Sequence, residues 1–200
     1  MASEVEICNM ALSFLGVDTI AALTEDSNEG KLCRLHYPLV RDAVLRAYSW
    51  GFAIRRTSLA AVLPAPDYQW LHQYQLPTGP SPLRCLRVLD TEQDESSAKR
   101  LWKVEGSKIL TNYPAPLNIR YIAQVVDSQA FDPLFVIALS MRMAGFLAAN
   151  ATESAGRIEQ SRIAYEAAIT EARATDAATG QSGRIRGTLF LESREDSFSG

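Results

Sequence analysis

The residues best suited to acid–base chemistry are the chain's two histidines, His36 and His72. A triad-type nucleophile needs a histidine base, and the Gly-x-Ser-x-Gly turn that often presents a reactive serine does not occur in the sequence. His72 alternates with Trp70 and Tyr74 in a strand-like segment, and His36 lies in a stretch with helical spacing. Both positions favour a packed or capping histidine, so we predict no catalytic residue.

A zinc site would need closely spaced pairs of ligands, and Cys33 with His36 is the one such pair, one turn apart on a helix. A second pair is missing, so Cys8, Cys85 and His72 could join it only through the fold. Three widely spaced cysteines are an odd number, which argues against a disulfide framework and favours a reducing compartment. We therefore predict buried thiols, no metal and no cofactor.

The other chemical motifs are weak. The acids of residues 90–95 lack the glycine and the terminal glutamate of an EF-hand loop, so a solvated loop is expected there. Neither a Gly-x-Gly-x-x-Gly nor a Walker sequence occurs, which removes the commonest phosphate-binding loops. A pair of carboxylates for glycoside cleavage stays possible by residue type, because 23 acidic residues allow many pairs.

The composition favours a packed, soluble protein. At 200 residues, 47% hydrophobic and 22% charged, the chain suits one domain, with or without a smaller lobe. A net charge of −3 argues against nucleic-acid binding through neutralised phosphates. The acids of residues 1–6 do not suit a signal peptide, and the apolar stretch 134–149 contains Arg142 and is too short for a membrane span.

Two helices are predicted before residue 50. Ser3 and Glu6 form a capping-box pattern that opens a helix ending near Gly16. A second helix begins near Ser27 and crosses Pro38 as one kinked helix, because its apolar stripe keeps its phase there. That stripe consists of Leu32, Leu35, Leu39, Val40, Ala43, Val44 and Ala47.

Residues 52–126 are rich in proline and alternate apolar with polar side chains, which is typical of strands with one covered face. Alternation is clearest at residues 70–76 and 117–125. Between them, Gly106-Ser107 is suited to a two-residue hairpin turn, and residues 90–100 are expected to form an exposed loop.

Helical spacing returns at Asp132-Pro133, where an N-cap carboxylate precedes a proline at the first helical position and Phe131 is placed as a staple. This helix, reaching residue 149, is apolar almost all round, as a central bundle helix would be. A last helix from about residue 152 or 154 to 174 packs by one side. Its predicted stripe is Ile158, Arg162, Tyr165, Ile169 and Ala172.

The closing segment carries β-forming and basic residues after a Gly/Ser linker. Such a segment is either a disordered tail or a strand that pairs with the sheet edge of a partner protein. Its three adjacent apolar residues favour the second alternative. The candidate binding residues are Arg184, Ile185, Arg186, Leu189, Phe190 and Leu191.

The predicted fold class is therefore α+β. A helical bundle of about four helices comprises residues 1–50 and 131–178, and an antiparallel β lobe, residues 51–130, is inserted into it. An extended C-terminal tail comprises residues 179–200.

Five stretches of this sequence, in this order, carry a resemblance to a known family. They are residues 9–16 (NMALSFLG), 33–46 (CRLHYPLVRDAVLR), 48–53 (YSWGFA), 74–77 (YQLP) and 83–88 (LRCLRV). The chain resembles, over roughly residues 1–175, the head-to-tail adaptor family of short-tailed bacteriophages, also called tail tubular protein A. Residues 78–82 (TGPSP) are longer than the turn associated with the family.

The resemblance implies a structural protein of the virion, made in the host bacterial cytoplasm and without enzymatic activity. It implies a dodecameric ring between the portal protein and the tail nozzle protein, through which genomic DNA passes during ejection without specific binding. It also implies that the C-terminal tail, with Arg184 to Leu191, reaches onto the portal. Two alternatives remain: a tail-associated cell-wall hydrolase, and a neck or stopper protein of another phage type.

Overall fold

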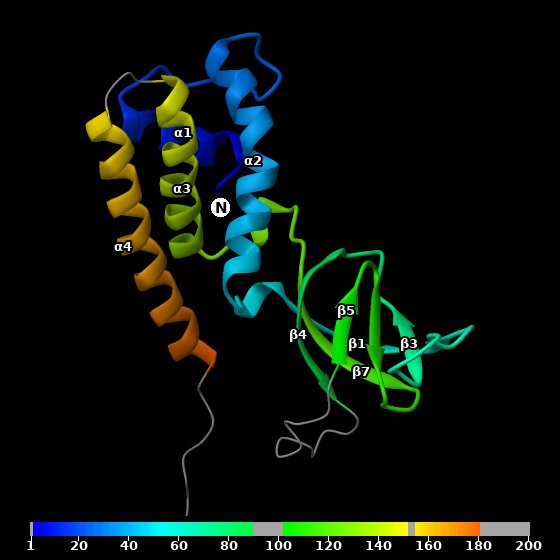
Figure 1. Cartoon of the computed structure of the whole chain (residues 1–200). Helices are drawn as coiled ribbons and strands as arrows, with labels where there is room; N and C mark the ends of the chain where they lie inside the picture. The colour runs from blue at the N-terminus through cyan, green and yellow to red at the C-terminus, as the bar shows by residue number, and fades with distance from the viewer. Residues whose placement is uncertain (1, 90–101, 152–154, 181–200) are drawn as a thin grey trace, which may run out of the picture.

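The computed structural model describes residues 2–89, 102–151 and 155–180. Within these residues the fold is α+β, as predicted, with four α-helices and two antiparallel sheets. The helices are α1 (Glu4–Leu15), α2 (Asn28–Ala47), α3 (Pro133–Ala151) and α4 (Ala155–Gly180). Figure 1 shows the helices gathered in a bundle, with the strands in a lobe beyond the C-terminal end of α2. No helix in the described part of the chain is long and apolar enough to cross a membrane.

The predicted starts of α1 and α2 are confirmed. The Glu6 backbone N–H donates to Ser3 Oγ at 3.2 Å, and the Ser3 N–H donates to Glu6 Oε2 at 2.6 Å, which completes the capping box. Gly16, with φ of +66°, ends α1 in the left-handed conformation that favours glycine. Ser27 caps α2 by accepting from the Gly30 N–H at 3.1 Å, and α2 continues through Pro38 as one helix.

The predicted core stripe of α2 is partly wrong. Val40 and Val44 are buried, but Leu35 and Leu39 are exposed. The helix has apolar residues on two opposite sides, and the side that packs against the rest of the bundle is the one carrying Cys33, Tyr37, Val40, Val44 and Leu45. The helical period is the same for both sides, so periodicity alone could not choose between them.

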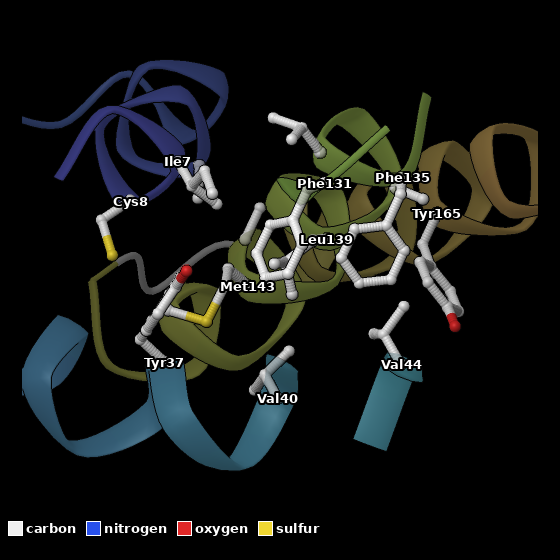
Figure 2. Packing of buried hydrophobic residues seen from close by; sticks show 14 of the residues in the cluster. Ile7, Cys8, Tyr37, Val40, Val44, Phe131, Phe135, Leu139, Met143 and Tyr165 are labelled. Carbon is white, nitrogen blue, oxygen red and sulfur yellow. The ribbon is translucent and has the colours of Figure 1, made fainter. Parts of the chain in front are cut away.

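The centre of the bundle is α3. Asp132 Oδ1 accepts from the Leu134 N–H at 2.8 Å and Pro133 is the first helical residue, both as predicted. The ring of Phe131 lies 4.9 Å from that of Phe135. The helix packs against α1, α2 and α4. Figure 2 shows side chains of all four helices meeting around Leu139. A helix surrounded on most sides needs an apolar surface on most sides, which explains its composition.

Helix α4 is longer than predicted, because it continues beyond residue 174 to Gly180. Two contacts fix its last turns: Asp176 Oδ1 accepts from the Gly51 N–H at 2.9 Å, and the Arg173 carbonyl accepts from Tyr48 Oη at 3.3 Å. Tyr165, Ile169 and Ala172 are buried as predicted. The predicted stripe was wrong in the first turns of the helix, because Ile158 and Arg162 are exposed.

The β lobe contains two sheets, ordered β1-β7-β4 and β2-β3-β6-β5, and every described pair of strands is antiparallel. The predicted hairpin is confirmed, with Glu105 opposite Lys108 and Gly106 at φ of +58°. The predicted strand at residues 70–76 is shorter than expected, and the predicted loop at residues 90–100 lies outside the described residues. The strands are β1 (Ile54–Leu59), β2 (Ala61–Val62), β3 (His72–Gln75), β4 (Pro82–Leu89), β5 (Trp102–Glu105), β6 (Lys108–Thr111) and β7 (Leu117–Ala123).

Two separate clusters of buried residues form the core, one centred in the bundle and extending to Ile122 of β7, the other in the lobe. Polar contacts join the two parts: Arg84 Nη2 donates to Ser49 Oγ at 3.2 Å, and Gln124 Nε2 donates to Asp42 Oδ2 at 2.7 Å. Asp42 also pairs with the buried Arg41, whose Nε lies 2.9 Å from Asp42 Oδ1. The lobe is therefore anchored on the bundle at the end of α2.

Candidate assembly surfaces

The tail residues proposed to bind a partner, Arg184, Ile185, Arg186, Leu189, Phe190 and Leu191, lie outside the described residues. The described surfaces belong to the bundle and the lobe, and the described part of the chain ends at Gly180.

The two histidines are packed against aromatic rings in different parts of the molecule. His36, on α2, is half-buried, and its ring centroid lies 5.8 Å from that of Phe146 on α3. His72, on β3, is half-buried with its ring 6.4 Å from Tyr74. These positions agree with the prediction of packed imidazoles.

Cys33 is directed toward Cys8, and both thiols are buried between α1 and α2. The hydrogen bond with Cys33, together with burial, raises the pKa of Cys8 well above its usual range. Among the described residues, no group of three His, Cys, Asp or Glu side chains could hold a metal ion. The pair Cys33 and His36, which spacing singled out, therefore lacks further ligands in this part of the chain.

Cys85, on β4, is half-buried, and burial raises its pKa to about 11. We expect this thiol to be mostly protonated at pH 8 and to react with a thiol reagent more slowly than free cysteine does, while Cys8 and Cys33 do not react until the protein unfolds. Labelling with and without urea, followed by peptide mass spectrometry, measures both rates. Rapid labelling of Cys8 in the native protein would contradict this placement.

The first candidate contact surface lies on the outer side of α2, and we call it the α2 surface. It consists of Leu35, Leu39 and Ala43, and the two leucines are 61% and 68% exposed. Residues four apart lie on one side of a helix, so these side chains form a continuous apolar row. Arg34 and Arg46, both exposed, lie on the same helix. An apolar row with a charged rim is typical of a protein–protein contact.

The second candidate surface, the lobe tip, consists of Leu63, Tyr68 and Leu71 in the segment between β2 and β3. They are 86%, 76% and 65% exposed. Beside them is an open recess of about 280 Å³ whose lining includes Trp70 and Lys108. Large apolar side chains held this far into solvent favour contact with another molecule.

The third candidate surface is a groove between α3 and α4, which we call the α3/α4 groove. It has a volume of about 220 Å³ and is lined mainly by apolar side chains. The Arg142 guanidinium lies over the rings of Phe146 and Tyr165, 5.2 and 5.0 Å from their centroids. Phe146 and Ile158 are exposed at its walls. The lining residues are Met141, Arg142, Gly145, Phe146, Ile158, Ser161, Arg162 and Tyr165.

Sequence reasoning did not identify these three surfaces, although one signal was available. The apolar row of α2 is too wide for one buried stripe, which indicates a second covered side. The groove depends on contact between α3 and α4, and the exposure of the lobe-tip residues depends on how the rest of the lobe packs, so neither has a local signal. No family model and no curated protein matches this chain.

Proposed function

We propose that this chain is a structural head-to-tail adaptor of a short-tailed phage virion, forming a ring between the portal and the tail nozzle through which DNA passes. The observation that carries the proposal is the pair of exposed apolar surfaces on different parts of one subunit, the α2 surface and the lobe tip. A subunit that contacts different neighbours needs separate contact surfaces of this kind. The resemblance in sequence supplies the identity of those neighbours.

Ring assembly fits the geometry of these surfaces. A closed ring needs heterologous contacts, in which one patch of a subunit binds a different patch of the next. The α2 surface belongs to the bundle, and the lobe tip lies in the lobe beyond the end of α2 (Figure 1). Two separate surfaces on one subunit can therefore supply the two different patches that such a contact requires.

The charge of the chain suits a channel for DNA. A strongly basic lumen would hold the duplex through its phosphates, whereas a chain with a net charge of −3 has no such general attraction. Passage of DNA without specific binding is thus compatible with the composition. The proposal assigns no catalytic role to any residue.

The tail supplies the contact with the portal in this proposal. Arg184, Ile185, Leu189 and Phe190 combine strand-forming backbone with apolar anchors, which suits the addition of a strand to a partner's edge. Deleting residues 181–200 is expected to weaken binding to purified portal rings by about tenfold or more. Surface plasmon resonance with immobilised portal rings measures the change.

A shorter deletion, of residues 192–200, is the matched control, because it keeps residues 184–191 and is expected to bind like the full chain. If deleting residues 181–200 leaves portal binding undiminished, the assigned role of the tail is wrong.

A further inference from the structure

The α3/α4 groove has the size and lining of a site for a large apolar side chain. A dry apolar cavity of about 150 Å³ is enough to bind benzene, and this groove has a volume of about 220 Å³. Phe146 and Ile158 expose apolar surface at its walls. The groove therefore leaves uncovered a surface that burial against an aromatic ring would stabilise.

Charge at the groove is unbalanced. Arg162 pairs with Glu159 at 2.6 Å, but Arg142 contacts only the rings of Phe146 and Tyr165 among the described residues. A guanidinium stacked on aromatic rings still has its in-plane N–H donors available for a carboxylate. The groove thus suits an apolar segment that is followed by an acidic residue.

The chain contains such a segment after α4. Leu189, Phe190 and Leu191 are followed directly by Glu192. No other segment outside the described residues has three adjacent large apolar side chains beside an acid. The residues between, 181–188, begin with Gln-Ser-Gly, a composition that permits the chain to reverse direction.

The number of residues between Gly180 and the apolar segment also fits the distance from Gly180 to the groove. Along α4, Tyr165 lies about 22 Å and Ile158 about 33 Å from Gly180, at 1.5 Å per residue. Residues 181–188 span at most about 29 Å when extended, which brings residues 189–191 to the level of the groove. On the same basis Arg186 reaches the level of the exposed Glu166. A segment much shorter than this could not reach the groove.

We propose that the α3/α4 groove binds Leu189, Phe190 and Leu191 of the same chain, with Phe190 inserted between Phe146 and Ile158 and Glu192 paired with Arg142. In the free subunit this contact covers the apolar end of the tail. The consequence for assembly rests on the proposed function: the portal would compete with the groove for the same three residues.

Limited trypsin digestion of the isolated full-length chain tests the contact. Arg186 and Arg194 flank the bound residues, so docking slows cleavage after both. Phe190→Glu is expected to speed both cleavages by about tenfold, the ratio that corresponds to a docking free energy of about 1.4 kcal/mol. Because this substitution lies outside the bundle and the lobe, misfolding of those parts is not a concern. Phe198→Glu, farther along the tail, is the matched control and is expected to leave both rates unchanged.

A reciprocal pair of variants tests the groove. Ile158→Glu is expected to speed the same cleavages, whereas Ile163→Glu, at an exposed isoleucine of the same helix outside the groove, is not. Equal rates in the wild type, Phe190→Glu and Ile158→Glu would overturn the proposal. So would protection that rises with protein concentration, because the tail would then bind a second copy. Portal binding plays no part in this assay, so its failure would leave the proposed function standing.

Discussion

Replacing Trp50 with alanine is expected to lower the free energy of unfolding by about 4 kcal/mol, within the range measured for large aromatic residues in cores. Trp50 is buried where α2 ends and the chain enters the lobe. Its ring lies 5.0 Å from the rings of Tyr48 and Phe135, and its Nε1–H donates to the Val44 carbonyl at 3.0 Å. Removal leaves a cavity at the junction and takes away the hydrogen bond to the Val44 carbonyl.

Urea unfolding followed by circular dichroism measures this change. Trp70→Ala is the matched control, since Trp70 is half-buried beside the lobe tip, and it is expected to cost about 1 kcal/mol. If both substitutions lower stability equally, Trp50 does not hold the junction together.

Charging the α2 surface is expected to abolish ring assembly while leaving the fold intact. In Leu35→Glu/Leu39→Glu, two side chains that are 61% and 68% exposed in the free subunit become acidic, so the stability of the subunit changes little. In a contact between subunits the same change removes two apolar anchors and buries charge, which is expected to weaken association by about 100-fold.

Negative-stain electron microscopy of the variant mixed with portal rings counts the complexes, and circular dichroism checks the fold. Ile163→Glu, on the outer side of α4, is the control and is expected to assemble normally. Normal assembly of the double variant would exclude the α2 surface from the contacts between subunits.

The starts of the helices could be predicted because their signals are local. The Ser3 and Glu6 capping box, Ser27, and Asp132 before Pro133 each act within one turn of the backbone they cap. The hairpin at Gly106 is local in the same sense, because its turn requires a positive φ.

The predictions failed where contacts between segments far apart in the sequence decide which residues are buried or where a helix ends. The apolar rows of α2 that contain Leu35 and Val40 both follow the helical period. Only packing against the rest of the bundle decides that Val40 is buried and Leu35 is not. The end of α4 depends on the contact of Asp176 with Gly51, far away in the sequence. The α3/α4 groove likewise arises only when two helices meet, so no single window of sequence could reveal it.

Electron cryomicroscopy of the purified full-length chain mixed with portal rings is the decisive experiment for the proposal that this chain is a structural ring subunit. We expect a closed ring of this chain seated on the portal, with the α2 surface covered by neighbouring subunits. Portal rings that remain bare at high subunit concentration, with the chain a folded monomer beside them, would contradict it.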